Sequence, residues 1–233
     1  MPKVISCVNL KGGVGKTALA VNFAAYCGSI GKKTLLIDLD PQTNATFSCI
    51  KPEKWEKHSN KNGSVAEILG VRNHVKADTG PVDVRKTIIK NVFRGVDLIP
   101  SHLDLFTIDL EIGARVARES LLKRALEDVK DSYEVIVCDC PPNLTLPTQN
   151  ALAMSTHYVV PVSPDFLSSL GIALLMKRVS AFGKDLGVEI QNAGIVLSRV
   201  GRQSYFRAQT TQSIRDTFDG AVLATEITER SVV

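Results

Sequence analysis

The feature that most constrains this sequence is a glycine-rich heptapeptide, Lys-Gly-Gly-Val-Gly-Lys-Thr, at residues 11–17. An apolar run from Val4 to Val8, typical of a buried strand, precedes it, and a helical pattern from Thr17 to Ser29 follows it. Glycine adopts backbone conformations that are costly for other residues, so this loop can turn tightly and aim successive N–H groups at one point. A buried strand, a glycine loop and a helix in this order predict an α/β fold with a functional site at the loop.

Apolar runs and helical patterns alternate along the remaining chain, which predicts a twisted, mainly parallel β-sheet with helices on both faces. Further strands are expected at residues 34–37, 96–99, 135–138, 157–162 and 193–197, and helices at 115–129, 148–154, 170–184 and 205–218. We interpret the polar segment 51–63 as a surface excursion within a single domain that spans residues 1–233. Ser64 to Glu67 matches a capping box that opens a short helix.

Composition excludes several classes of protein. Apolar residues make up 44% of the chain and charged residues 22%, which is an ordinary globular balance. No apolar run approaches the roughly 18 residues of a membrane span, and the amino terminus leads directly into a strand, so we expect a cytoplasmic protein that does not bind membranes. The five cysteines have no C-x-x-C spacing and the four histidines lie far apart, so we expect reduced, mostly buried thiols and no zinc site.

The heptapeptide has the chemistry of a phosphate-binding loop. Its N–H groups and the partial positive charge of the following helix attract an anion. Lys16 is placed to neutralise phosphate charge, and the Thr17 hydroxyl can bind Mg²⁺. The standard pattern G-x-x-x-x-G-K-[ST] expects a glycine where this chain has Leu10, and Lys11 is an added cation that we interpret as functional.

Acidic residues follow two of the predicted strands. Asp38 and Asp40 end the second strand, and Asp139 ends the strand that starts at Val135. Because ligands of parallel α/β sheets bind at the carboxyl ends of the strands, we expect these carboxylates near the loop. Asp38 and Asp40 are suited to holding metal-bound water or polarising an attacking water. Asp139 fits a Walker-B aspartate that holds Mg²⁺ through water beside Thr17.

The motifs KGGVGKT, DLDPQ and DCPP, in this order, resemble those of the ParA/MinD superfamily of deviant-Walker ATPases, and most closely the ParA (Soj-like) partition ATPases. The resemblance extends from about Pro2 to the last residues of the chain. It implies a P-loop NTPase fold, ATP and Mg²⁺ as cofactors, and an ATP-dependent homodimer with two nucleotides between the protomers. Two triphosphates held face to face repel each other, so a cation supplied by each partner makes such a dimer depend on nucleotide.

The resemblance also implies roles for individual residues. Lys11 matches the signature lysine that reaches the partner's phosphates, Lys16 matches the phosphate lysine, and Asp40 matches the aspartate needed for hydrolysis. Thr17, Asp38 and Asp139 match residues around Mg²⁺ and its waters. The expected nucleotide contacts are Lys11, Gly12, Gly13, Val14, Gly15, Lys16, Thr17 and Ala18, with Ser198 and Arg199 on the adenine side.

The carboxy-terminal region departs from the family pattern. Ala18 stands where members usually carry a second threonine, and residues 225–231 lack their usual proline-arginine pair. The sequence also stops at Val233, where relatives continue into another helix, so we expect the given sequence to be a truncated or partly ordered version of such a chain. The absence of a guanine-reading N-K-x-D motif favours ATP over GTP.

A basic stretch near the carboxy terminus is the candidate DNA surface. It contains no acid between Arg199 and Arg215, and aromatic side chains are interleaved with its arginines. Arginines on one surface bind DNA phosphates without reading sequence. The expected DNA contacts are Arg199, Arg202, Arg207 and Arg215. The resemblance implies a nucleoid-associated ATPase whose dimers bind nonspecific DNA and whose slow hydrolysis is stimulated by a ParB-like adaptor on the cargo.

Other functions stay open at the sequence level. The cargo of such an ATPase is a plasmid, a chromosome origin, or a protein assembly such as a carboxysome or a chemoreceptor array. A MinD-like membrane-cycling ATPase would need a carboxy-terminal basic amphipathic helix, which is not visible. A nitrogenase-iron-protein-like electron carrier would need a cysteine pair between protomers, which Cys138 and Cys140 on the Walker-B strand do not suit. A nucleotide-binding scaffold without turnover is disfavoured by Asp40.

Overall fold

The computed structural model describes residues 1–71, 82–165, 168–200 and 205–228, and its strands form one sheet in the order β3-β4-β2-β5-β1-β6-β7-β8. The strands are β1 (Lys3–Cys7), β2 (Thr34–Asp38), β3 (Ile89–Phe93), β4 (Val96–Ile99), β5 (Val135–Asp139), β6 (His157–Val162), β7 (Gln191–Val200) and β8 (Ile227–Thr228). Neighbouring strands pair in parallel, except β3 and β4, which are antiparallel. The predicted α/β fold with a mainly parallel sheet is confirmed.

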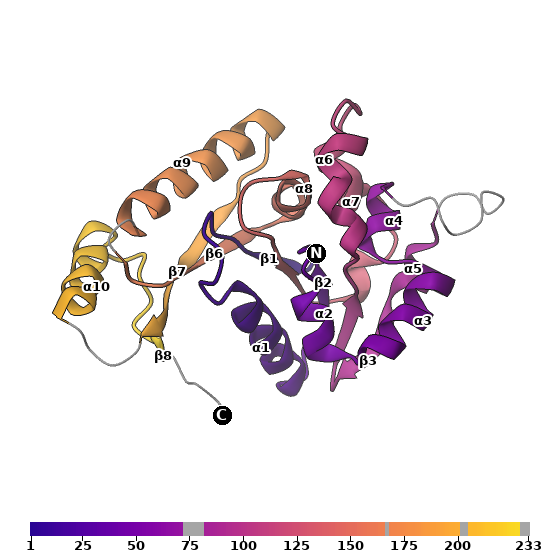
Figure 1. The fold of residues 1–233 in the computed structure, drawn as a ribbon, viewed down its shortest axis with the longest axis horizontal. Coiled ribbons are helices and arrows are strands. Elements are labelled where there is room, and N and C mark those ends of the chain that lie inside the picture. Colours follow the sequence, from indigo (N-terminus) through magenta and orange to yellow (C-terminus); the bar gives the residue numbers. More distant parts are fainter. Residues whose placement is uncertain (72–81, 166–167, 201–204, 229–233) are drawn as a thin grey trace.

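Helices cover both faces of the sheet, with α1, α2 and α3 on one side and α7, α8 and α9 on the other (Figure 1). The helices are α1 (Lys16–Ser29), α2 (Asn44–Cys49), α3 (Pro52–Asn62), α4 (Val65–Leu69), α5 (Val84–Thr87), α6 (Ile108–Glu111), α7 (Leu121–Ala125), α8 (Leu146–Met154), α9 (Ser168–Leu186) and α10 (Tyr205–Thr217). Three short 3₁₀ helices are η1 (Leu103–Thr107), η2 (Arg118–Ser120) and η3 (Lys130–Ser132).

Alternating side chains of the central strands divide the core into two layers. Leu35 and Ile37 of β2 pack in the layer that includes Leu152 of α8, whereas Leu36 packs in the other layer with Ala24 of α1. All five side chains are buried. Strands that are buried on both faces are continuous apolar runs, which is why the central strands are readable in the sequence.

The segment 51–63 lies on the surface as expected, but most of it forms the helix α3. Pro52 occupies the first turn, where its missing N–H costs no hydrogen bond, and Gly63 ends the helix with a φ of 85°. Trp55 anchors this helix, because its indole N–H donates to the carbonyl of Ser101 at 2.9 Å.

The sequence prediction was wrong for part of the chain between residues 84 and 132. Within the helix expected at 115–129, the structure has only the short η2 and α7, and η3 begins after this range, at Lys130. Ala117 before η2 has a left-handed φ of 53°. Strand β3 was not predicted. It forms an antiparallel hairpin with β4 through Gly95, which has a φ of 73°.

Smaller predictions are confirmed by the structure. Ser64 and Glu67 form the capping box, with the Glu67 carboxylate accepting from the Ser64 N–H at 2.7 Å. All five cysteines are free thiols, and all except the half-buried Cys49 are buried. Within the residues that the structure describes, no helix combines the length and the apolar character needed to cross a bilayer.

Candidate nucleotide-binding site

The three motifs meet at the carboxyl edge of the sheet. Strand β5 lies between β1 and β2, and Asp139 at its end is in register with Cys7 on one side and Asp38 on the other. The loop that follows β1 therefore begins beside Asp139. The strand order, which the sequence does not state, brings together residues that are separated by about a hundred positions in the chain.

The loop at residues 11–17 has the backbone that its glycines allow. Gly13 and Gly15 have φ values of 72° and 84°, in the left-handed region that favours glycine. A β-carbon on Gly12 would meet no atom within 4 Å, so nothing in the protein itself fills the space beside it. This open approach to the backbone suits a ligand that comes close to the loop.

Lys16 is the buried cation of the site. Its side chain is only 6% exposed, and its ammonium group donates to the carbonyl of Lys11 at 3.0 Å, so it lies across the loop. Burial lowers the pKa of Lys16, and the carboxylates of Asp139 and Asp40 oppose this shift. The lysine thus has acidic neighbours but no direct ion pair in the described structure, which leaves its charge available to an anion.

Asp139 is buried in a setting that disfavours its charge. Neither of its carboxylate oxygens has a hydrogen-bond partner of normal geometry, although the Thr17 hydroxyl is near enough to favour ionisation. Burial raises the pKa of Asp139 well above its usual value, and the neighbouring Asp38 carboxylate raises it further. Such a group is stabilised by a cation placed next to it.

This arrangement fits Mg²⁺ better than a metal held only by protein. Among residues 1–71, 82–165, 168–200 and 205–228, no cluster of three or more His, Cys, Asp or Glu side chains is arranged to hold a metal ion. Mg²⁺ usually keeps several waters and takes one or two protein ligands together with phosphate oxygens. The Thr17 hydroxyl, with Asp139 behind it, provides that kind of incomplete ligand set.

Asp38 is already engaged with the backbone of the next loop. Its carboxylate accepts from the Asp40 N–H at 3.1 Å, from the Thr46 N–H at 2.8 Å and from the Thr46 hydroxyl at 2.7 Å. Burial nevertheless raises the pKa of Asp38 to about 7, because these hydrogen bonds only partly offset desolvation. Asp38 therefore positions the loop of residues 38–46.

Asp40 is held on this loop by further hydrogen bonds. Its carboxylate accepts from the Gln42 N–H at 2.9 Å, and its main-chain carbonyl accepts from the Ser101 hydroxyl at 2.7 Å. The residue is 7% exposed. The structure thus holds the expected hydrolytic aspartate in a fixed loop, with its side chain largely buried.

Lys11 lies at the outer side of the loop. Its side chain is 61% exposed and forms an ion pair with Asp165, which follows β6. Its own N–H donates to Asn9 at 2.9 Å, and Asn9 in turn donates to the carbonyl of Pro161 at 2.7 Å. The loop is therefore connected to the segment after β6.

Ser198 lies beneath the loop. Its buried hydroxyl donates to the carbonyl of Val14 at 2.6 Å, and a β-carbon on Gly15 would lie 3.7 Å from the Ser198 side chain. Ser198 thus supports the phosphate loop in this structure, and its contact with adenine stays a prediction. Ala18 is exposed in the first turn of α1, and the side chain of Arg199 lies outside the described residues.

The candidate DNA residues are only partly placed. Arg207 is exposed on α10. Arg215 is 29% exposed, forms an ion pair with Glu226 at 2.7 Å and donates to the carbonyl of Leu223 at 3.3 Å. Arg202 lies outside the described residues. A common surface formed by these arginines therefore stays a prediction.

Four residues that support the site were missed at the sequence level: Asn9, Thr46, Ser101 and Asp165. Thr46 and Ser101 carry no sequence signal, since only the parallel pairing of β2 with β4 brings them together. Asp165 stands in the run Val-Val-Pro-Val-Ser-Pro-Asp-Phe, whose polar end after a strand is the one available signal.

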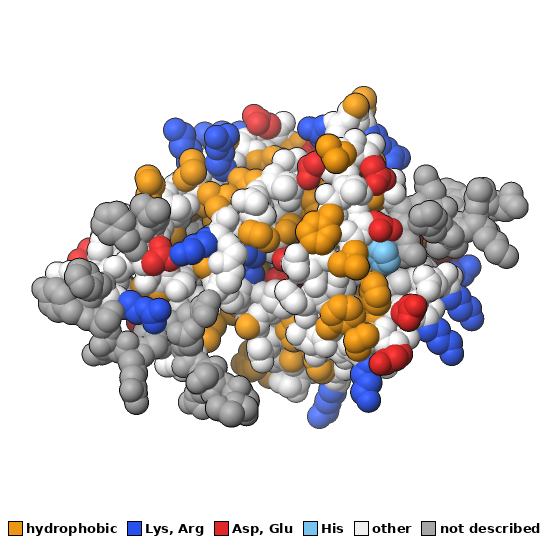
Figure 2. Space-filling model, viewed as in Figure 1, with side chains coloured by type: hydrophobic (Ala, Val, Ile, Leu, Met, Phe, Trp, Pro, Cys, Tyr) orange, Lys and Arg blue, Asp and Glu red, His pale blue; other side chains and the backbone are white. Residues whose placement is uncertain are grey.

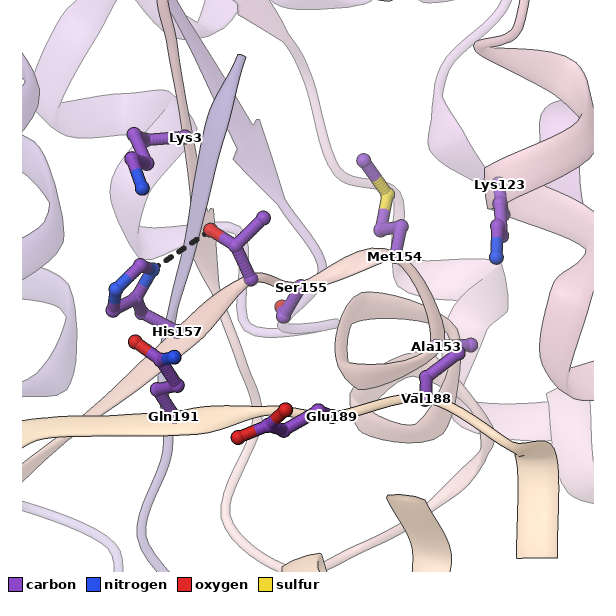
Figure 3. Close-up of a pocket in the computed structure, with 10 residues that line it drawn as sticks. Lys3, Lys123, Ala153, Met154, Ser155, His157, Val188, Glu189 and Gln191 are labelled. Carbon is purple, nitrogen blue, oxygen red and sulfur yellow. Dashed lines mark hydrogen bonds between the residues drawn. The ribbon is translucent and has the colours of Figure 1, made fainter. Parts of the chain in front are cut away.

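A pocket lies away from this site, at the opposite, amino-terminal edge of the sheet (Figure 3). It has a volume of about 370 Å³, and it is lined by the starts of β1, β6 and β7, the end of α8 and Lys123. Lys3 and Lys123 lie on different sides of it, and none of the predicted site residues lines it. The candidate nucleotide site is therefore the carboxyl edge, where ligands of parallel sheets bind.

The parallel sheet, the loop between β1 and α1, and the acidic strand ends define a P-loop nucleotide-binding protein. Residues 2–192 match a family described as an AAA domain. The sporulation initiation inhibitor protein Soj of Bacillus subtilis is 35% identical over 228 residues, which cover 97% of this chain and 84% of that protein. The chain belongs to the ParA/Soj-like family of P-loop ATPases.

Solved structures support the same fold. Cobyrinic acid a,c-diamide synthase from Mycobacterium smegmatis, crystallised with an ATP analogue and magnesium, is 27% identical with a TM-score of 0.83, covering 100% of this chain and 87% of that chain. A plasmid partition protein from Borrelia burgdorferi is 29% identical with a TM-score of 0.78, covering 98% of this chain and 90% of that chain.

Proposed function

We propose that this chain hydrolyses ATP to ADP and phosphate, and that it uses the cycle to position a cargo on the nucleoid as a ParA-type partition ATPase. The proposal that the chain binds ATP rests on one observation. Asp139, whose two buried carboxylate oxygens lack hydrogen-bond partners, lies beside a glycine loop that the buried side chain of Lys16 crosses. A cation and an anion bound together satisfy both groups, and ATP with Mg²⁺ is that combination. The cofactors are ATP and Mg²⁺.

Binding uses groups that are already in place. The N–H groups of residues 12–18 and the amino terminus of α1 attract the phosphates, and Lys16 exchanges the Lys11 carbonyl for phosphate oxygens. Thr17 and Asp139 are the residues that would hold Mg²⁺, with Asp38 close to Asp139. When bound, Mg²⁺ neutralises the phosphates and the charge that develops on them during transfer.

Hydrolysis needs a water that is aligned with the terminal phosphate. We assign this task to Asp40, whose loop is fixed by Ser101 and Gln42. A carboxylate orients water by accepting its hydrogen bonds. Hydrolysis is slow in the isolated chain, because the alignment is completed only when a partner adjusts this loop.

Dimerisation follows from Lys11. Its exposed ammonium group lies at the outer side of the loop, where a second protomer with its own triphosphate brings a strong negative charge. Exchange of Asp165 for the partner's phosphates makes assembly depend on ATP. This step is supported by the geometry of one chain and by the family to which it belongs.

The cellular role is supported by the partition proteins among the similar proteins. We propose that dimers bind nonspecific DNA through Arg199, Arg202, Arg207 and Arg215, and that a ParB-like adaptor on a plasmid or chromosome stimulates hydrolysis. Doubling the basic surface in a dimer strengthens DNA binding without a new contact. The chain then acts in the cytoplasm, in association with the nucleoid.

Nucleotide binding by Lys16→Ala tests the proposal. Loss of a charge-assisted contact to phosphate, worth about 3 kcal/mol, weakens ATP binding on the order of a hundredfold. Lys32→Ala is the matched control, since Lys32 is exposed and pairs with Glu134 at the opposite edge of the sheet. Isothermal titration with ATP and Mg²⁺ measures both, and unchanged affinity in Lys16→Ala would contradict the proposed site.

A further inference from the structure

Ser101 joins three separate segments of the chain around the loop of residues 38–46. It lies just after β4 and is fully buried. Its hydroxyl donates to the Asp40 carbonyl at 2.7 Å, its N–H donates to the Thr46 hydroxyl at 3.0 Å, and its carbonyl accepts from the Trp55 indole N–H at 2.9 Å. The three polar groups of this one residue therefore hold the loop, α2 and α3 together.

The hydrogen bonds within the loop determine its shape. The Asp40 carboxylate accepts from the Gln42 N–H at 2.9 Å, and the Asp40 carbonyl accepts from the Thr43 N–H at 2.9 Å. Both bonds join residues of the same loop. The Ser101 hydroxyl, in contrast, reaches the Asp40 carbonyl from the end of a neighbouring strand. Ser101 therefore fixes where Asp40 lies relative to the sheet.

Thr43 shows that the loop is held in a conformation that its own sequence disfavours. This residue is buried and has a left-handed φ of 61°. A β-branched residue keeps such a backbone only where the surrounding structure holds it, and strain of this kind is concentrated in functional loops. Contacts from outside the loop are therefore needed to maintain its geometry.

Trp55 supports Ser101 from the outer side. Besides its hydrogen bond to the Ser101 carbonyl, its ring stacks on His102 with centroids 5.3 Å apart and meets Phe47 of α2 edge to face at 5.4 Å. Phe47 is 42% exposed, and Figure 2 shows hydrophobic side chains gathered over the region of α2. Helix α3 thus contacts, through one side chain, both the segment after β4 and the helix that follows the loop.

We propose that Ser101 and Trp55 are positioning residues for ATP hydrolysis. Ser101 fixes the Asp40 backbone, and with it the carboxylate that orients water, and Trp55 fixes Ser101. This inference rests on the role proposed for Asp40. It gives the surface helix α3 a part in turnover but none in ATP binding, which we assign to the loop of residues 11–17.

The first test separates turnover from binding. Phosphate release by the full chain with Mg²⁺ over a range of ATP concentrations gives kcat, and isothermal titration gives the ATP affinity. Ser101→Ala lowers kcat about tenfold or more, because a small displacement of an orienting group is costly, and it leaves the ATP affinity unchanged. Ser155→Ala is the matched control, since that buried hydroxyl donates to the Ala151 carbonyl at 2.8 Å at the amino-terminal edge of the sheet, and it keeps wild-type turnover.

The second test compares two side chains of α3 that each contact a carbonyl group. Trp55→Phe keeps an aromatic ring and loses the N–H that reaches Ser101, so it lowers kcat about threefold or more. In the control His58→Phe, the ring loses the nitrogen that lies 3.0 Å from the Thr87 carbonyl, and turnover is unchanged. A helix that served only the stability of the fold would give equal effects in the two variants.

The third test asks whether Ser101 acts through Asp40. In an Asp40→Ala background, Ser101→Ala lowers the residual turnover no further, because the group that it positions is already absent. Trp55 is the sole tryptophan of the chain, so its emission spectrum shows whether α3 is still seated in each Ser101 variant. If Ser101→Ala does not fold, the comparison of Trp55→Phe with His58→Phe decides alone.

Three results would overturn the inference: wild-type kcat in Ser101→Ala, an equal loss of kcat in Trp55→Phe and His58→Phe, or a further loss on adding Ser101→Ala to Asp40→Ala. Failure of the proposed function is distinguishable. In that case Asp40→Ala itself keeps wild-type turnover, or the wild-type chain does not bind ATP. The inference fails alone when Asp40→Ala loses turnover and Ser101→Ala does not.

Discussion

Replacement of Asp139 by asparagine separates the stability of this protein from its ligand chemistry. In the nucleotide-free chain, Asp139 is a buried carboxylate without a hydrogen-bond partner, close to Asp38 and Asp40. The amide of Asp139→Asn cannot ionise, so it adds no charge to this cluster as the pH rises, and it brings an N–H donor that the neighbouring carboxylates can accept from. An unsatisfied buried group costs about 1–3 kcal/mol. Without ligand, we therefore expect the variant to be more stable than the wild type, with a free energy of unfolding that is about 1–2 kcal/mol higher.

The pH dependence of unfolding gives an independent readout. Burial raises the pKa of Asp38 from 3.8 to about 7, so the folded chain holds this proton more tightly than the unfolded chain. Stability therefore falls as the pH rises from about 4 to about 7, and the same direction holds for Asp139. Asp139→Asn removes one titrating group and lowers the repulsion on Asp38, so its stability changes less across this range.

With ATP and Mg²⁺ bound, we expect the wild type to become the more stable of the two proteins. At about a hundred times its dissociation constant, ATP with Mg²⁺ stabilises the wild type by about 2.7 kcal/mol. The variant gains much less, because it lacks the carboxylate behind Thr17. Urea unfolding with and without ATP and Mg²⁺ measures both effects. A variant that is less stable without ligand, or that gains as much from ligand as the wild type, would refute this reasoning.

Further predictions concern hydrolysis, DNA and the sheet edge. Asp40→Ala is expected to bind ATP normally and remain a DNA-bound dimer with turnover reduced at least about a hundredfold, as measured by phosphate release; wild-type turnover would remove Asp40 from its role. Alanine at Arg202, Arg207 and Arg215 together should weaken DNA binding in a mobility-shift assay and leave ATP-driven dimerisation unchanged; unchanged DNA affinity would place the DNA surface elsewhere. Burial raises the pKa of Asp97, but hydrogen bonds from Lys90, the Asn91 N–H and Tyr133 outweigh it and lower the pKa. The free energy of unfolding of Asp97→Asn should therefore be about 1–3 kcal/mol below that of the wild type at neutral pH, and the difference should shrink as the pH falls below about 4. An equal difference at low pH would contradict this account.

The central strands and the site could be predicted from the sequence because their signals are local. A glycine loop between an apolar run and a helix is readable within 30 residues, and Asp38 and Asp139 directly end apolar runs. The rule that ligands bind at the carboxyl edge then places these groups together without knowledge of the strand order.

What the sequence does not reveal depends on contacts between distant segments. Ser101 is an ordinary polar residue until β4 pairs with β2 and brings it to the Asp40 carbonyl. Strand β3 was missed because its burial is uneven, with Lys90 and Asn91 exposed, so it lacks a continuous apolar run.

The mass of the protein in solution tests the central claim most directly, namely that two chains enclose two nucleotides and that Lys11 of each chain contacts the other's phosphates. Light scattering of Asp40→Ala with ATP and Mg²⁺ should show twice the monomer mass, and Lys11→Ala added to this variant should return it to the monomer mass without loss of ATP binding. A monomer mass at saturating ATP, or a dimer that persists in Lys11→Ala, would contradict the account.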